Sequence, residues 1–188
     1  KGTVIVKHTN PCGVSAKKDH LESYKSALSC DPVSAFGGIV SCNFKITKNL
    51  ALELSKLFLE VIIANGFESN AIKILKAKKN LRLIDATNYR LEEDLKFVSY
   101  NQNIMLQSED LNLFSSKNFK IVSKQKPTPK QLKDLIFAFN VCRYVKSNAI
   151  VLASNETTVG IGSGQPSRLD SCQIAINKMK KFNLQNDN

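Results

Sequence analysis

TVIVKHTNPCG, residues 3–13, is the stretch that decides the fold. Its first four residues are all β-branched and largely apolar, which predicts a short buried strand over residues 3–7. Asn10, Pro11 and Gly13 then favour a turn. Lys7 and His8 stand where the strand passes into that turn. The stretch therefore predicts an ammonium group and an imidazole side by side at the end of a strand.

Apolar runs and amphipathic segments continue to alternate along the chain. The predicted strands cover 38–42, 61–65, 81–85, 147–154 and 159–164, with two weaker ones at 97–101 and 119–123. The predicted helices cover 19–29, 47–59, 68–78, 128–145 and 168–181. The fourth helix should turn the following residues inward: Leu132, Leu135, Phe139, Cys142 and Val145. Strands that alternate with helices predict an α/β layered sheet.

KPTPKQ, residues 126–131, marks the predicted boundary between two units. Residues 1–126 form the first unit with an irregular extension, and residues 127–188 begin the second. Thr128 and Gln131 have the spacing of a capping box at the start of the helix that follows. From Phe182 onward the sequence is polar, and we expect this tail to be frayed.

Composition limits the class of protein. The chain has 188 residues, 43% of them apolar, and a formal net charge of +11. That charge suits either a nucleic-acid surface or an anionic small-molecule site, but the lysines are scattered and no nucleic-acid motif is present, so we expect no nucleic-acid partner. No apolar run approaches the roughly 18 residues of a membrane span, so we expect no membrane partner. Five cysteines without a CxxC pair predict reduced thiols in a cytoplasm and no zinc module.

Lys7 and His8 are the first candidates for chemistry. An adjacent ammonium group disfavours a second positive charge, so the imidazole is expected to be neutral and able to accept a proton. The ammonium group could stabilise an oxyanion. Neighbouring side chains on a regular strand point to opposite faces, so both can serve one site only if the strand has ended or is bulged by His8. The alternative is an imidazole that only hydrogen-bonds within a loop.

Four further positions are candidates for ligand binding. SAFGG, residues 34–38, offers the Phe36 ring and backbone that a ligand can approach; the alternative is a turn with Phe36 in the core. Glu60 could bind ribose hydroxyls or could simply be solvated. GIGSGQPSR, residues 160–168, combines glycines, a helix start and Arg168, which suit a phosphate or carboxylate, although the stretch is neither a P-loop nor a dinucleotide motif. Asn148 could supply an amide donor and acceptor.

Five stretches together resemble one known family. They are KHTNPCG, DPVSAFGGIVSCN, EVIIANGF, VKSNAIVLAS and VGIGSGQPSR, in that order. Their order is similar to that in AICAR transformylase, the folate-dependent part of the bifunctional purine-synthesis protein that also carries IMP cyclohydrolase. The resemblance covers almost the whole chain. It implies formyl transfer from 10-formyltetrahydrofolate to the 5-amino group of AICAR, a step of de novo IMP biosynthesis, without a metal.

The resemblance also implies roles for residues. By family motif, His8 is the proton acceptor and Lys7 stabilises the transition state, while Leu169 lies by the folate. Glu60 stands where relatives have Asp, a change of reach rather than of charge. The nucleotide contacts carried over by motif are Phe36, Gly37, Glu60, Asn148 and Arg168.

The fold implied by the resemblance is cytidine-deaminase-like, a layered α/β/α arrangement in two related lobes of which the second is truncated. The zinc signature of the deaminases is missing, which disfavours zinc deamination. The resemblance also implies a homodimer, and we expect both the cyclohydrolase domain and the later part of the transformylase to lie outside this chain. Two alternatives therefore stay open, a nucleotide-binding unit without turnover and a basic RNA-associated domain.

Overall fold

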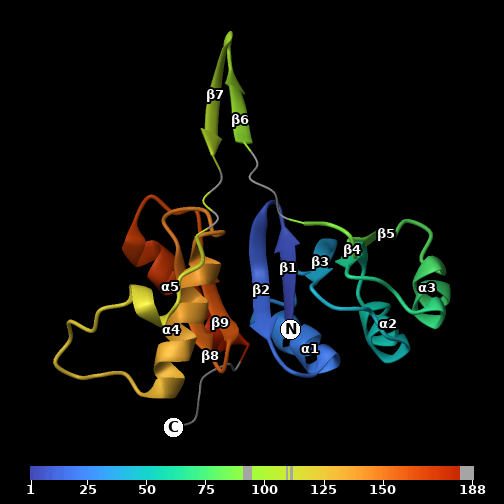
Figure 1. Ribbon diagram of the computed structural model, residues 1–188, viewed down its shortest axis with the longest axis horizontal. Coiled ribbons are helices and arrows are strands. Elements are labelled where there is room, and N and C mark those ends of the chain that lie inside the picture. Colours follow the sequence, from blue (N-terminus) through green and yellow to red (C-terminus); the bar gives the residue numbers. More distant parts are fainter. Residues whose placement is uncertain (91–94, 109, 111, 183–188) are drawn as a thin grey trace.

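A mixed seven-stranded sheet forms the centre of the molecule (Figure 1). The computed structural model describes residues 1–90, 95–108, 110 and 112–182. The strands lie in the order β5-β4-β3-β1-β2-β9-β8. They are β1 (Gly2–Lys7), β2 (Asn10–Ala16), β3 (Gly38–Cys42), β4 (Leu59–Ala64), β5 (Arg82–Asp85), β8 (Ile150–Ser154) and β9 (Thr157–Gly162). Strands β3, β4 and β5 are parallel, and all other neighbours are antiparallel. The predicted α/β class is confirmed.

Five α-helices accompany the sheet in the described residues: α1 (His20–Cys30), α2 (Lys48–Leu54), α3 (Ser69–Lys76), α4 (Pro129–Cys142) and α5 (Arg168–Lys181). The capping box predicted for α4 is present, because Thr128 N–H donates to Gln131 Oε1 over 2.9 Å and Gln131 N–H donates to Thr128 Oγ1 over 3.2 Å. Among the described residues, none of the helices is both long and apolar enough to span a bilayer.

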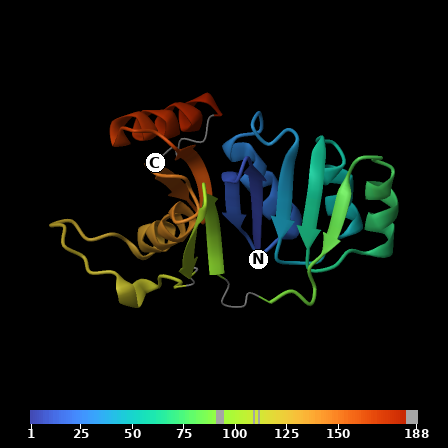
Figure 2. The ribbon, with the colours of Figure 1, turned by 90° about the horizontal axis from the view of Figure 1, so that it is seen from above.

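Helices α4 and α5 cover opposite faces of β9 (Figure 2). Gly160 and Gly162 face α5 so closely that a Cβ atom on either would overlap with its backbone carbonyl groups. Ile161, which lies between them, packs with Val141 and Val145 at the end of α4. The alternation of side chains along a strand thus separates the two helices.

Four predictions of local structure are wrong. Residues 10–16 form strand β2 rather than a turn, because Pro11 pairs with Val6 at a bulge of the ladder, where its missing N–H is tolerated. Helix α2 ends at Leu54 instead of residue 59. Residues 119–123 form no strand, and β6 (Leu95–Tyr100) pairs instead with β7 (Asn103–Ser108) in a separate hairpin that projects from the body (Figure 1).

The inward face predicted for α4 is the fourth error. Leu135 and Phe139 are 53% and 48% exposed. Helix α4 packs mainly on β8, the edge strand, so part of its apolar stripe has no sheet beneath it. The predicted tail lies outside the described residues from position 183 onward.

Candidate functional site

Strand β1 ends at Lys7, and His8 lies in the turn that follows it. His8 and Thr9 have φ angles of 50° and 63°, and Lys7 pairs with Asn10 to close a two-residue hairpin. Positive φ at both central residues is the geometry of a type I′ turn. The strand has therefore ended before His8, which meets the geometric condition for both side chains to serve one site. The imidazole is exposed and makes no side-chain hydrogen bond to another described residue.

Lys7 contacts the loop that carries Phe36 and Gly37. Its ammonium group donates a hydrogen bond to the Phe36 carbonyl group. Gly37 has a φ of 69°, and its N–H donates to the Phe58 carbonyl over 2.8 Å. A Cβ atom at position 37 would lie 3.3 Å from Lys7 Nζ, so a side chain there would crowd the ammonium group. The structure thus brings Lys7, Phe36 and Gly37 into direct contact.

Two aromatic rings lie exposed beside this contact. Phe36 and Phe58 are 57% and 47% exposed, and their ring centroids are 5.2 Å apart. Both rings line a cavity of about 410 Å³ together with Lys78 and Lys79. The helix predicted over residues 47–59 would include Phe58, but α2 ends at Leu54, so Phe58 lies beyond the helix. Glu60 is exposed at the start of β4, where the pairing with β3 shifts by one residue.

The second group of predicted residues lies at β8 and β9. Asn148 Nδ2 donates to the carbonyl groups of Gln165 and Pro166 over 2.9 and 2.8 Å, and Ser171 Oγ donates to the Asn148 carbonyl over 2.8 Å. The amide donors of Asn148 therefore hold its own loop, and Oδ1 is the atom left for a ligand. Arg168 and Leu169 open α5, and both are exposed.

Asn10 joins the two groups, a role that could not be predicted from its place in the expected turn. Its Oδ1 accepts a hydrogen bond from Lys146 N–H over 2.9 Å. The Lys146 carbonyl in turn accepts from Gly164 N–H over 2.7 Å. The hairpin of His8 is thereby tied to the loop that leads to Arg168.

All the predicted site residues lie at one end of the sheet. The strand directions bring together the ends of β1 and β9 and the starts of β2, β3, β4 and β8. Strands β4 and β9 are four spacings apart, or ~19 Å, with the β1–β2 hairpin midway between them. Within the described residues, no hydrogen bond or ion pair joins Glu60, Arg168 or Leu169 directly to His8. The candidate site therefore has two sides, one with Phe36, Gly37 and Glu60 and the other with Asn148, Arg168 and Leu169, and the hairpin of His8 lies between them.

The cysteine of the opening motif is not a nucleophile in this arrangement. Cys12 is buried, and burial raises the pKa of its thiol, with Asp31 adding to the rise. Burial likewise raises the pKa of Cys30 and of Cys42 to about 11. These thiols are protonated at neutral pH, as expected for small buried hydrophobic residues. In the described part of the chain, no group of three or more His, Cys, Asp or Glu residues could hold a metal ion.

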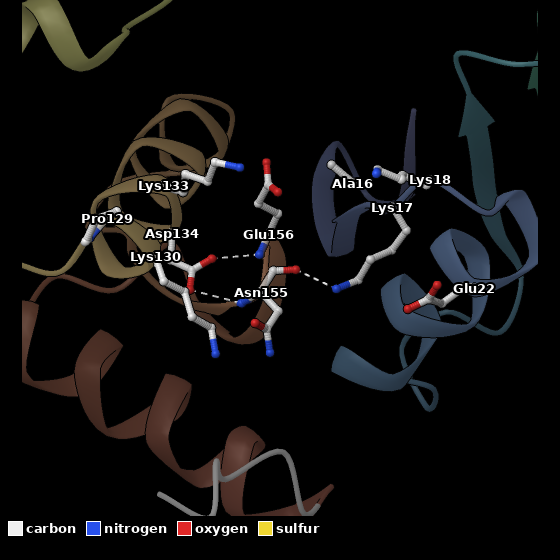
Figure 3. Close-up of a pocket in the computed structure, with 10 residues that line it drawn as sticks. All are labelled: Ala16, Lys17, Lys18, Glu22, Pro129, Lys130, Lys133, Asp134, Asn155 and Glu156. Carbon is white, nitrogen blue, oxygen red and sulfur yellow. Dashed lines mark hydrogen bonds between the residues drawn. The ribbon is translucent and has the colours of Figure 1, made fainter.

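A separate cavity of about 600 Å³ lies between the end of β2 and α4 (Figure 3). Its polar groups are used to join structural elements. The Asp134 carboxylate accepts from Asn155 N–H and Glu156 N–H over 3.0 and 2.7 Å, and Lys17 Nζ donates to the Asn155 carbonyl. None of the predicted site residues lines this cavity. It therefore lies at the contact between β2, α4 and the β8–β9 turn and is not part of the candidate site.

Comparison with known proteins gives one consistent family. The family described as AICARFT/IMPCHase bienzyme matches residues 1–178. The bifunctional purine biosynthesis protein PurH of Aquifex aeolicus is 45% identical over 178 residues, which cover 95% of this chain and 34% of that protein. The PurH protein of Rhodospirillum rubrum is 46% identical over 177 residues, 91% of this chain and 33% of that protein.

The PurH protein of Persephonella marina is 44% identical over 183 residues, 96% of this chain and 35% of that protein. The chain thus spans about a third of the length of these curated relatives.

Proposed function

The chain belongs to the AICARFT/IMPCHase bienzyme family, and on that premise we propose that it provides the proton-transfer and nucleotide-binding residues of an AICAR transformylase. The reaction transfers a formyl group from 10-formyltetrahydrofolate to the 5-amino group of AICAR. The position of Lys7 and His8, at the end of β1 and midway along the candidate site, is the observation that supports the proposal most directly.

His8 serves as the base in this proposal. The lone pair of the AICAR amine delocalises into the imidazole ring and the carboxamide, so the amine attacks the formyl carbon weakly. As the new carbon–nitrogen bond forms, His8 takes the proton that the amine must lose. The tetrahedral intermediate then collapses with cleavage of the bond to N10 of the folate, and the imidazolium returns its proton to N10. The exposed position of His8 leaves its ring accessible to substrate.

Lys7 stabilises the oxyanion of that intermediate. An ammonium group has three donors, and one of them is used on the Phe36 carbonyl. Two donors are left for the developing negative charge. The same hydrogen bond sets the distance between Lys7 and the loop of Phe36 and Gly37, so oxyanion stabilisation and nucleotide binding depend on one loop conformation.

The nucleotide is held by groups on both sides of the hairpin. Phe36 and Gly37 offer a ring face and a backbone without a side chain, and Glu60 offers a carboxylate for ribose hydroxyls. On the other side, Asn148 Oδ1 and the Arg168 guanidinium suit the polar and anionic parts of AICAR, while Leu169 offers apolar surface, 80% exposed, to the folate.

The proposal extends to the wider organisation of the protein. The cytidine-deaminase-like two-lobed arrangement and the homodimer follow from the family resemblance. The unit boundary near residue 127 rests on the KPTPKQ stretch, and the cytoplasmic location rests on the cysteine pattern. The sheet that continues from β2 into β9 is compatible with two lobes that share one layer. The substrates are AICAR and the formylfolate, with no nucleic acid or membrane partner.

A formyl-transfer assay with AICAR and 10-formyltetrahydrofolate tests the proposal, together with thermal unfolding of the chain with and without AICAR. Product formation supports the transferase. Thermal protection by AICAR without product identifies the alternative, a nucleotide-binding unit without turnover. If AICAR neither protects nor reacts, the proposal is overturned, and salt-sensitive RNA binding that AICAR does not compete would identify the chain as an RNA-associated domain.

A further inference from the structure

An ion pair between a buried carboxylate and a partly exposed lysine joins the loop after α1 to α5. The Asp31 side chain is 4% exposed, and its Oδ2 accepts from Lys178 Nζ over 2.6 Å and from Ser34 Oγ over 2.7 Å. Its Oδ1 accepts from Ser34 N–H over 2.9 Å. Burial alone would raise the pKa of Asp31, but the hydrogen bonds from Lys178 and Ser34 hold it below its ordinary value of 3.8. The carboxylate is therefore charged at neutral pH.

The loop from Asp31 to Gly38 is built around this carboxylate. Ala35 N–H donates to the Asp31 carbonyl over 3.2 Å, and Gly38 N–H donates to the Ala35 carbonyl over 3.0 Å. Between them, Phe36 and Gly37 make the contacts to Lys7 and Phe58 described above. The loop thus connects Asp31 with the Phe36 carbonyl group, which accepts the hydrogen bond from Lys7.

Lys178 belongs to the helix that Arg168 opens. The two are ten positions apart along the α-helix, a rise of about 15 Å. Helix α5 is seated on β9 by Gly160 and Gly162, whose missing side chains allow its backbone to lie against the strand. Because Lys178 and Arg168 lie on one helix, their relative position is fixed, and the contact with β9 places both relative to the sheet.

We propose that Asp31 and Lys178 are positioning residues, whose ion pair holds the loop of Phe36 and Gly37 in a set position relative to α5 and Arg168. This inference rests on the proposed function, because it assigns the pair to the two sides of the nucleotide site. Buried ion pairs contribute little net stability compared with apolar replacements, since desolvation offsets the attraction between the charges. The main effect of this pair is therefore expected on the relative position of the two elements that it joins, the loop of Phe36 and Gly37 and helix α5.

Four variants test the inference. Lys178→Met leaves the buried carboxylate unpaired, and the double variant Asp31→Asn with Lys178→Met removes both charges, so that stability recovers. Lys178→Arg keeps a cation within reach of Asp31. Lys180→Met is the matched control, because Lys180 is exposed on the same helix. Each variant is measured by thermal unfolding, by AICAR titration calorimetry, and by hydrogen exchange of the amides of residues 35–38.

If the pair has a positioning role, the variants should lose AICAR affinity even where their thermal stability is restored. We expect both the Lys178→Met and the double variant to bind AICAR about tenfold more weakly and to exchange the amides of residues 35–38 faster. The double variant should nevertheless unfold near the wild-type temperature. Lys178→Arg should restore AICAR affinity, and Lys180→Met should match the wild type in all three measurements.

Two results would overturn the inference. One is an AICAR affinity that recovers together with stability in the double variant, because the pair would then act only on folding. The other is wild-type exchange of the amides of residues 35–38 in both variants. If the wild-type chain fails to bind AICAR, the proposed function fails, and the exchange measurement, which needs no ligand, still decides whether the pair holds the loop.

Discussion

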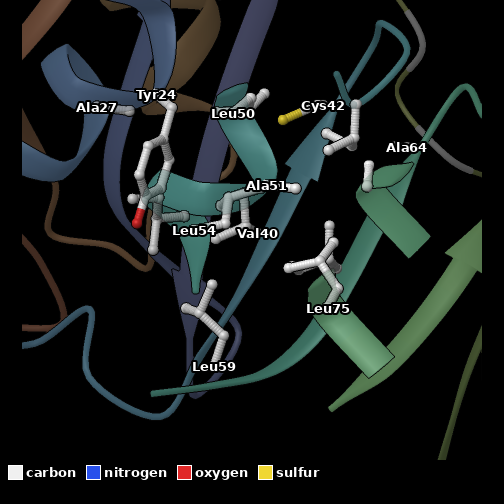
Figure 4. Packing of buried hydrophobic residues seen from close by; sticks show 14 of the residues in the cluster. Tyr24, Ala27, Val40, Cys42, Leu50, Ala51, Leu54, Leu59, Ala64 and Leu75 are labelled. Atoms are coloured by element: carbon white, nitrogen blue, oxygen red, sulfur yellow. The ribbon is translucent and has the colours of Figure 1, made fainter. Parts of the chain in front are cut away.

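The two sides of the candidate site rest on parts of the sheet that are packed very differently. Helices α1 to α3 cover β1, β3 and β4 with a continuous core, part of which is shown in Figure 4. The large side chains of this core that have no exposed surface include Ile5, Val40, Leu50, Ile62 and Leu75. At the other side every residue of β8 is only half-buried, and the buried hydrophobic cluster there contains four described residues, Cys30, Val141, Val145 and Ile161.

This difference bears on function. The hairpin of Lys7 and His8 continues a strand of the dense core, whereas Asn148 and Arg168 belong to the sparsely packed side. Segments with few buried apolar contacts open at lower free energy. We therefore expect the proton-transfer residues to be rigidly held and the Asn148–Arg168 side to adjust to its ligand.

Replacement of His8 should give the largest effect. We expect His8→Ala to lower turnover by about 10²- to 10⁴-fold, the range of general base catalysis, with nearly unchanged AICAR affinity. Single-turnover formyl transfer and calorimetry measure the two quantities. His20→Ala is the matched control, because His20 is the other histidine of the chain and stacks on Phe44 away from the site. Near-normal turnover of the His8 variant would exclude this residue as the base.

Core substitutions test the packing difference itself. Leu50→Ala removes a side chain with no exposed surface and should lower the free energy of unfolding by about 2–5 kcal/mol. Leu152→Ala makes the same change on the half-buried strand β8 and should cost only about 1 kcal/mol. Denaturant unfolding followed by circular dichroism measures both. Equal costs would show that the two sides are packed alike and would remove the basis of the comparison.

The dense side is also the part whose fold the sequence predicted best. Strands β1, β3, β4 and β5 were predicted as short apolar runs, and a helix was predicted at each of α1, α2 and α3, although α2 ends earlier than predicted. Strand β2 was missed because Pro11 and Gly13 are typical of turns, and only the bulge opposite Ile5 and Val6 makes them compatible with a ladder. The hairpin β6–β7 was half predicted, because its residues are exposed and no core imposes a pattern on them.

The site residues were predicted from sequence motifs, whereas the hydrogen bonds and contacts that connect them could not be predicted. Lys7, His8, Phe36 and Arg168 were named from local stretches, and their roles remain predictions. Asn10 was named only as a turn residue, and Phe58 was only included in a predicted helix. Their contacts at the site were not predicted, because their partners are distant in the sequence or depend on where α2 ends. Asn10 binds a backbone group 136 positions away, a contact that no local pattern encodes.

Asn10 connects the two sides of the site by a hydrogen bond, so its replacement should loosen the position of one side relative to the other. Asn10→Ala leaves Lys146 N–H without its acceptor, which should cost about 1 kcal/mol of stability. Because the loop before Arg168 loses its tie to the hairpin, AICAR affinity should also fall severalfold. Chemical denaturation and calorimetry measure the two changes. Asn10→Asp, which keeps an acceptor, is the matched control, and equal losses in both variants would argue against the hydrogen bond as the cause.

Helix caps give the smallest contrast between the two sides. Asp19 caps α1 on the dense side and accepts from Glu22 N–H over 2.8 Å, whereas Ser167 caps α5 and accepts from Asp170 N–H over 3.4 Å. We expect Asp19→Ala to lower stability by about 1 kcal/mol, and Ser167→Ala to lower it by less than about 0.5 kcal/mol because its hydrogen bond is long. Thermal unfolding measures both, with Asp19→Asn as a control that keeps the cap.

The effect of the two cap variants on AICAR binding should be in the opposite order. Only Ser167 adjoins Arg168, and loss of its cap frees the first turn of α5. If Asp19→Ala weakened AICAR binding more than Ser167→Ala, the division of roles between the two sides would be wrong.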